Sequence, residues 1–207
     1  ILDSNQRVTS ALGVYTDITA EERERLKTNQ IIDNNPIPFL ILKPDLTIEG
    51  SNLAFFTLSG YSKDQLFKMN LGDFKILKIE GTSSKECVTT KKEAISESLI
   101  DFPSGKKHIR IYSIPILDEN NDVASVLITC VDLTAQKHLA DYLQTEVIRL
   151  SKNLENLAEG NLEFDLRTGE PDEYTKNAHD QFTTIQNNLK GAGDNLVKVT
   201  EEMEYFI

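Results

Sequence analysis

Residues 52–62 read Asn52-Leu53-Ala54-Phe55-Phe56-Thr57-Leu58-Ser59-Gly60-Tyr61-Ser62. This stretch predicts a short helix that ends at Gly60, because glycine readily adopts the left-handed conformation that terminates a helix. Ser62 is a favourable N-cap residue and predicts a second helix over residues 63–69. Two short helices therefore follow each other directly in this part of the chain.

Short strands are predicted on both sides of these helices. Residues 38–42 and 46–49 read as strands around a turn at Lys43-Pro44-Asp45. A third helix is predicted over residues 86–96, followed by strands at 98–102, 106–116 and 123–131. The order β-β-α-α-α-β-β-β, over about 100 residues, predicts an α+β domain with an antiparallel sheet.

The last strand of this domain has a second copy in the chain. Residues 1–12 align without gaps on 116–127, and with 17–20 on 132–135 there are ten identities in twenty positions at an offset of 115. Such an offset fits a whole small domain rather than a solenoid unit. We therefore expect residues 1–19 to be the C-terminal strand of a preceding domain, and the chain to belong to an array of domains.

A helical pattern begins directly after the repeated strand. At Asp132-Leu133-Thr134, Thr134 is expected to be the helix N-cap, with Asp132 near the positive end of the helix. This strand-to-helix unit is the predicted signal junction. Residues 20–33 predict a connector helix with acidic residues early and basic residues later, which ends before Pro36.

Residues 34–134 resemble PAS sensor domains. The resemblance rests on the pattern Asn52-x-Ala54-x3-Leu58-x-Gly60-Tyr61-Ser62 and on the terminal Asp132-Leu133-Thr134. Residues 101–108 are similar to PAS domains of archaeal chemotaxis receptors. The resemblance implies a ligand site between sheet and helices. The candidates for its lining are Phe39, Ile41, Leu53, Phe56, Tyr61, Phe74 and Ile109, although the same residues could simply fill the core.

The chromophores and redox cofactors of this family are not expected here. Cys87 lies outside the Asn-Cys-Arg-Phe motif of photoactive flavin domains, and the chain lacks the tryptophan typical of redox-flavin versions. His108 falls on a predicted strand among Lys106, Lys107 and Arg110, where a solvated basic hairpin explains it better than haem ligation. We expect no cofactor, and a small colourless ligand stays open.

The C-terminal part of the chain has the spacing of coiled-coil helices. The first seam consists of Leu143, Val147, Leu150, Leu154 and Leu157. The second contains Phe182, Ile185, Leu189, Ala192, Leu196, Val199, Met203 and Phe206. A single helix of this kind is marginal in water, so the seams predict a parallel homodimer.

Residues 135–190 resemble a HAMP domain, a dimeric parallel four-helix bundle that passes conformational signals. The first helix is expected at about 137–159, the connector at 160–171, and the second helix from 172, continuing as a coiled coil over 191–207. By this resemblance Gly160 turns the chain, Leu162 and Leu166 pin the connector, and Glu173 opens the second helix. The chain departs from the pattern in lacking the early proline and in placing Thr175 where a small residue is usual.

Composition excludes several classes of function. The 33 acidic and 22 basic residues give a net charge of −11, which argues against nucleic acid or anionic membrane as partners. No apolar run reaches the ~20 residues of a membrane span. Two separated cysteines, Cys87 and Cys130, favour a reducing cytoplasm, and with three histidines they form no metal-ligand spacing.

These features predict a non-catalytic, cytoplasmic relay segment of a chemotaxis-type receptor, which acts on a downstream signalling domain and an associated histidine kinase. His138 lacks the context of a phosphoacceptor, and no Gly-rich phosphate loop is present. The alternatives are the sensor part of a histidine kinase, or a PAS domain used only as a dimerisation scaffold.

Overall fold

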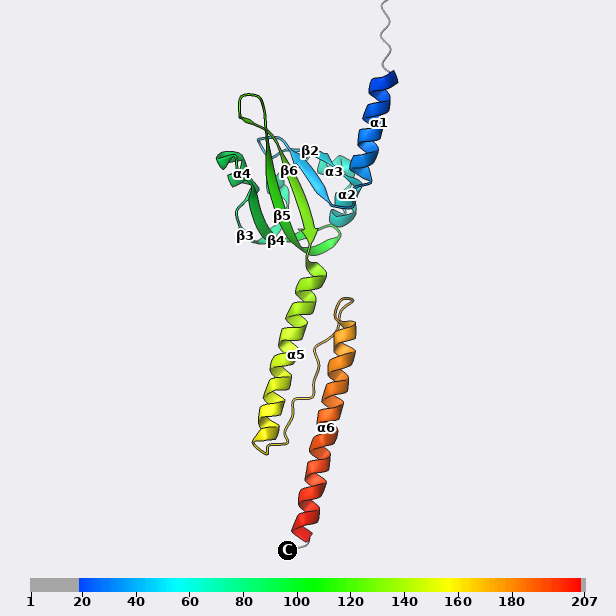
Figure 1. Ribbon diagram of the computed structural model, residues 1–207, viewed down its shortest axis with the longest axis vertical. Helices are drawn as coiled ribbons and strands as arrows, with labels where there is room; N and C mark the ends of the chain where they lie inside the picture. The colour runs from blue at the N-terminus through cyan, green and yellow to red at the C-terminus, as the bar shows by residue number, and fades with distance from the viewer. Residues whose placement is uncertain (1–18, 206–207) are drawn as a thin grey trace, which may run out of the picture.

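The computed structural model describes residues 19–205. It consists of an N-terminal helix, a domain of one sheet with short helices, and two longer C-terminal helices (Figure 1). The first helix, α1, spans Thr19–Asp33, close to the predicted connector helix. The strand predicted within residues 1–19 lies outside the described residues, apart from Thr19 at the start of α1.

Within residues 19–205, six strands form one antiparallel sheet in the order β2-β1-β6-β5-β4-β3. The antiparallel α+β arrangement expected from the sequence is thus confirmed. The central pairs are long: all nine residues of β4 pair with β5, which runs against β6 over most of its length. The strands are β1 Phe39–Leu42, β2 Ile48–Ser51, β3 Ile76–Gly81, β4 Ala94–Phe102, β5 Gly105–Leu117 and β6 Val123–Asp132.

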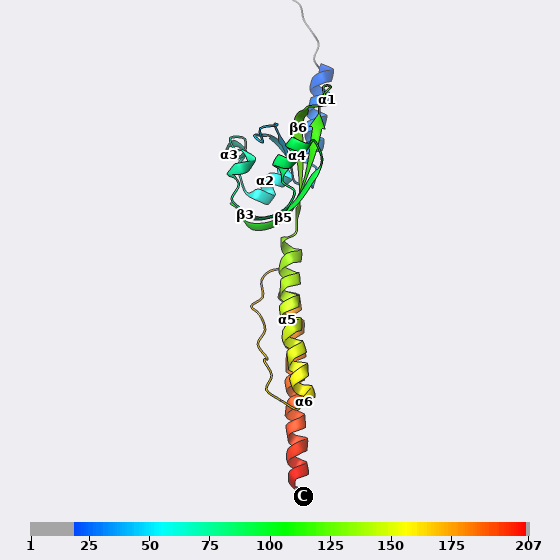
Figure 2. The same ribbon diagram turned by 90° about the vertical axis from the view of Figure 1, so that its left-hand side faces the viewer.

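Short helices cover one face of this sheet, as Figure 2 shows for α2 and α3. They are α2 Leu53–Ser59, α3 Lys63–Leu66, the 3-10 turn Leu71–Asp73 and α4 Ser84–Thr90. The fully buried Asn52 caps α2 by accepting from the N–H of Phe55, and it also accepts from the N–H of Phe39. Gly60 ends α2 at φ 75°, where an added Cβ would lie 2.8 Å from the backbone nitrogen of Ser104.

Two elements differ from the sequence-based expectation. The helix predicted over 86–96 stops at Thr90, because Lys91 turns the chain at φ 56° and residues from Ala94 onward pair with β5. Strand β3, whose residues are all exposed, was not predicted. Leu77-Lys78-Ile79-Glu80 alternates apolar and polar residues, but over only four residues, which is at the lower limit for predicting a strand.

The core between sheet and helices is dominated by aromatic rings. Phe55, Phe74 and Phe102 are buried and contact one another edge to face, with ring centroids 5.8–6.3 Å apart. Tyr61 adds ring contacts to Phe74 and Phe102. Such tilted arrangements suit the ring quadrupoles and stabilise the core beyond simple burial.

The two C-terminal helices, α5 Thr134–Ala158 and α6 Lys176–Tyr205, run in the same direction, and residues 159–175 return between them along one flank (Figures 1 and 2). α5 begins three residues before the expected position. α6 begins at Lys176 rather than at residue 172, because the Asp172 carboxylate accepts the N–H groups of Tyr174 and Thr175 and holds these residues in a turn.

Candidate functional site

The structure separates the residues that were expected to line a ligand pocket. Phe74 and Ile109 lie in the core, and Phe56 and Tyr61 pack against it. Phe39 and Ile41 alternate along β1 with the core residues Leu40 and Leu42, so they lie on the opposite face of the sheet. Leu53 is 62% exposed. The prediction is therefore wrong for Phe39, Ile41 and Leu53, because the pattern of apolar residues did not reveal which face each one occupies.

The predicted signal junction joins the sheet directly to α5, but its hydrogen bonds differ from those expected. Leu133, not Thr134, is the N-cap residue, and it makes no side-chain cap. The N–H of Thr134 donates to Asp132 Oδ1 at 2.8 Å, while its hydroxyl accepts from the N–H of His108 on β5 at 3.0 Å. The N–H of Leu133 donates to the carbonyl of His108 at 2.7 Å. The first turn of α5 is thus fastened to β5 through both backbone groups of one residue.

Ion pairs reinforce this attachment on the outward face of the sheet. Glu97 of β4 binds Arg110 of β5 at 2.6 Å and Lys137 of α5 at 3.2 Å. These two hydrogen bonds, that of Arg110 first, lower the pKa of Glu97. Lys107 of β5 also lies 3.6 Å from Asp132. A hollow of about 230 Å³ beside Glu97 and Lys137 is lined by residues of both the sheet and α5.

The ring of His138 joins α5 to the end of the connector. Its Nδ1 lies 2.5 Å from the carboxylate of Asp172, and its edge meets the rings of His108 and Tyr174. The hydrogen bond with His138, followed by that with Thr175, lowers the pKa of Asp172 to about 2. Strand β5, helix α5 and the turn before α6 therefore meet at one corner of the molecule.

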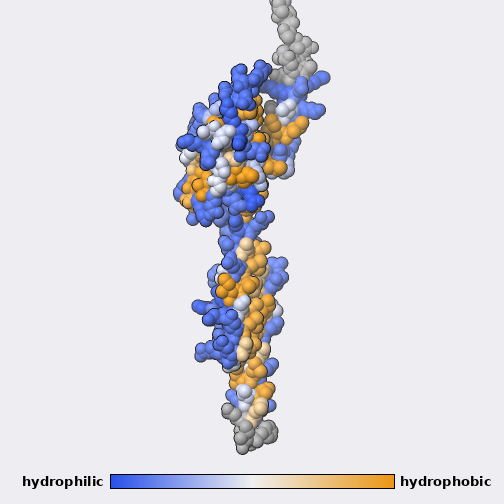
Figure 3. Space-filling model, turned by 60° about the vertical axis from the view of Figure 1, so that its left-hand side comes forward, coloured by the Kyte–Doolittle hydropathy of each residue, from blue (hydrophilic) through white to orange (hydrophobic). Residues whose placement is uncertain are grey.

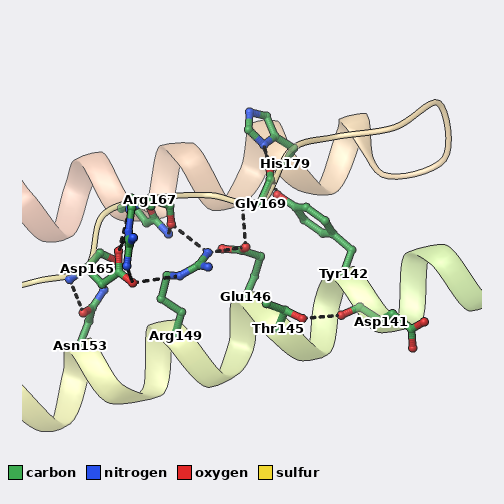
Figure 4. A network of polar contacts seen from close by, with 11 residues as sticks. Asp141, Tyr142, Thr145, Glu146, Arg149, Asn153, Asp165, Arg167, Gly169 and His179 are labelled. Carbon is green, nitrogen blue, oxygen red and sulfur yellow. Dashed lines mark hydrogen bonds and ion pairs between the residues drawn. The ribbon is translucent and has the colours of Figure 1, made fainter.

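Polar side chains of α5 bind the backbone of the connector along its length (Figure 4). Asn153 binds Asp165 in both directions: its Nδ2 donates to the carbonyl and its Oδ1 accepts from the N–H, each at 2.8 Å. Three more side chains each make one such bond. Glu146 accepts from the N–H of Gly169, Arg149 donates to the carbonyl of Arg167, and Asn156 donates to the carbonyl of Glu163. We call the four side chains Glu146, Arg149, Asn153 and Asn156 the polar ladder.

The polar ladder works because two periods match. Its members follow one another at steps of 3, 4 and 3 along α5, whereas their partners lie two residues apart in the extended connector. Three to four helical residues rise about 5 Å, and two residues of chain can span up to about 6.6 Å, so the connector can keep pace with the helix over the three steps between the four contacts. Glu146 and Asn153 are fully buried. The polar ladder was not predicted from the sequence. The signal that could have revealed it is the row of polar residues at helical spacing beside the apolar seam of α5.

The residues assigned by the HAMP resemblance lie in the segment between the helices. Gly160 turns the chain after α5 at φ 75°, and Leu162 and Leu166 are half-buried. Glu173 is exposed in the turn before α6, so it does not open that helix as expected. Thr175 and Asp172 do so instead, each accepting a hydrogen bond from the backbone N–H of the other.

The predicted seam residues divide into two groups. Phe182 and Leu189 are buried within the chain, and Leu150 and Leu157 are half-buried. Phe206 lies outside the described residues. The remaining seam residues are exposed, and their large apolar side chains form a band along the helix pair, visible in Figure 3. We call this band the apolar face; it consists of Leu143, Val147, Leu154, Ile185, Leu196, Val199 and Met203.

No protein-family model and no curated protein matches the sequence. Among solved structures, the chain is similar to the PAS domain of an HTR-like protein from Haloarcula marismortui, with 18% identity over 55% of this chain and 95% of that one and a TM-score of 0.45. A PAS domain from a two-component sensor histidine kinase matches at 17% identity, 54% and 98% coverage and a TM-score of 0.44. A PAS domain from Colwellia psychrerythraea matches at 20% identity over 55% of this chain and 98% of that one, also with a TM-score of 0.44.

Two further properties bear on the site. Between residues 19 and 205 no helix combines the length and hydropathy needed to cross a bilayer. Over the same residues, no group of three or more His, Cys, Asp or Glu side chains is placed to hold a metal ion.

Proposed function

We propose that this chain is a cytoplasmic sensory relay of a signalling receptor, in which the PAS-like domain controls a dimeric, HAMP-like helix bundle through α5. The parent protein is a chemotaxis-type receptor whose output acts on a histidine kinase. This choice rests on the resemblance of residues 101–108 to PAS domains of archaeal chemotaxis receptors and of residues 135–190 to a HAMP domain.

The attachment of α5 to the sheet carries this proposal. α5 continues β6 after a single intervening residue, Leu133, and its first turn is bonded to both backbone groups of His108 and to Glu97. A displacement of β5 relative to the core is therefore transmitted to α5 without a flexible linker. In this proposal β5 and α5 have two positions relative to the core. A ligand shifts the balance between these two states only by its difference in affinity for them.

The apolar face supports a second copy of the chain as the partner. Burying a large apolar side chain contributes about 1.5–3 kcal/mol relative to leaving it in water, and the seven residues of this face lie exposed along two parallel helices. Two copies related by a two-fold axis parallel to the helices would cover both faces and form a four-helix bundle.

Native mass spectrometry of the purified chain tests the proposal. A sensor relay is expected to give a dimer, and a small molecule retained at near-equal stoichiometry would identify the stimulus class. The scaffold alternative predicts a dimer whose helix packing is unchanged by any substitution at the junction. A strictly monomeric chain at micromolar concentration would contradict both.

A further inference from the structure

Helix α6 carries Gly191 and Gly193 near its middle, where glycine weakens a helix relative to alanine. The two glycines have different surroundings. An added Cβ at Gly193 would lie 2.7 Å from Cε2 of Phe164, whereas at Gly191 it would meet nothing within 4 Å. The ring of Phe164 therefore rests against the backbone of α6 at Gly193, in a notch that any side chain would fill.

The connector on either side of Phe164 is held by the polar ladder. Asn156 binds the carbonyl of Glu163, and Asn153 binds both backbone groups of Asp165. The aromatic side chain between them projects to α6. Phe164 is thus positioned by α5 and inserted into α6, so it connects the two helices across the connector.

A second contact fixes the same register of α6. Gln186 donates to the carbonyl of Arg167 at 3.0 Å. Seven helical residues separate Gln186 from Gly193, a rise of about 10 Å, and three extended residues separate Arg167 from Phe164, also about 10 Å. A slip of α6 by one residue, or a rotation that carries Gly193 away from the connector, would break both contacts together.

We propose that Phe164 and Gly193 are positioning residues that set the axial and rotational register of α6 against α5. This inference rests on the proposed relay, because register decides the direction in which α6 presents Leu196, Val199 and Met203 to the second copy. Phe164 lies between Leu162 and Leu166. It holds the connector independently of these two leucines, because its ring packs against the backbone of α6 at Gly193.

A melting-temperature cycle on the full chain tests the contact. Gly191→Ala is the matched control and should raise the Tm of the helix pair by about 2–4 °C, because alanine favours helix and the site is open. Gly193→Ala should lower it, because the methyl group displaces the ring. Phe164→Ala removes the obstacle, so adding Gly193→Ala to it should raise the Tm as Gly191→Ala does. If Gly193→Ala behaves like Gly191→Ala in the wild-type background, the notch does not exist.

Cysteine cross-linking tests the register. Disulfide formation between copies is measured at Val199→Cys in α6 and, separately, at Val147→Cys in α5. Gly193→Ala should change the rate at position 199 several-fold and leave that at 147 within about twofold, since a shift of this size follows from a modest change in population. A lowered Tm with both rates unchanged would reduce Phe164 to a purely structural contact. Absence of cross-linking in both parent variants would contradict the proposed dimer, while the melting cycle would still decide the notch.

Discussion

The hydroxyl of Thr134 accepts a hydrogen bond from the backbone N–H of His108 at 3.0 Å, which joins the first residue of α5 to strand β5. Thr134 is 4% exposed, so no solvent replaces this bond if it is lost. The neighbouring bond from Leu133 to the carbonyl of His108 completes the attachment. The start of the outgoing helix is therefore part of the hydrogen-bonding pattern of the sheet.

Thr134→Val is expected to destabilise the chain by about 1–3 kcal/mol, because it keeps the shape of the side chain and leaves the N–H of His108 without its acceptor. Thr134→Ser retains the hydroxyl and should cost much less. Urea unfolding measures both effects, and cross-linking through Val147→Cys reports whether the packing of α5 changes. Equal stability of the two variants would show that the hydroxyl does not hold the junction.

Charges on the apolar face should separate the copies. Leu154→Lys combined with Val199→Lys places four ammonium groups in the bundle of a dimer and should give monomers with unchanged helix content, since both side chains are about half exposed in the single chain. Ile148→Lys, at an exposed position outside this face, is the control and should leave the dimer intact. Leu189 is unsuitable because it is buried within the chain. Sedimentation velocity distinguishes the outcomes.

Both cysteines should be inert in the folded protein. Burial raises the pKa of the Cys130 thiol to about 12, and burial also raises that of Cys87. At neutral pH neither forms an appreciable amount of thiolate, so a colorimetric thiol reagent should react only after denaturation. Rapid labelling of the native chain would mean that the inner face of the sheet opens to solvent.

Acid should weaken the corner around His138 in a defined range. The pKa of Asp172 is lowered to about 2 from an ordinary value of 3.8. The Asp172 carboxylate therefore contributes its full stabilisation above pH 3.8 and loses it as the pH falls through about 2. Asp172→Asn should be less stable than wild type at neutral pH and should approach it in stability over this interval. Urea midpoints measured against pH test this, and parallel curves for the two proteins would exclude the His138–Asp172 contact as a cause.

Local sequence signals predicted much of the fold. Gly60 and Ser62 mark a helix end and a helix start through conformations and caps that involve only neighbouring residues, and the structure has both. The order of elements and the antiparallel sheet followed from similar local patterns. The exceptions are β3, an edge strand with no buried residue and only a short alternating pattern, and the helix expected over 86–96, which ends at Thr90.

The candidate site depended more on contacts between distant residues. The sequence identified Thr134 at the junction but not its partner, because His108 lies 26 residues away and is brought near only by the pairing of β5 with β6. Likewise, the apolar pattern at Ile41 and Leu53 could not show that these side chains face away from the core.

The sequence by itself determined the end of α2 at Gly60, the start of α3 after Ser62 and the two seams along α5 and α6, because these properties depend on residues within one or two turns of each other. Only the tertiary structure decided which seam residues stay exposed, how the polar ladder holds the connector, and why Gly193 must lack a side chain beside Phe164. These features arise where segments far apart in the chain meet, and there the available space and the available hydrogen-bond partner are set by the other segment.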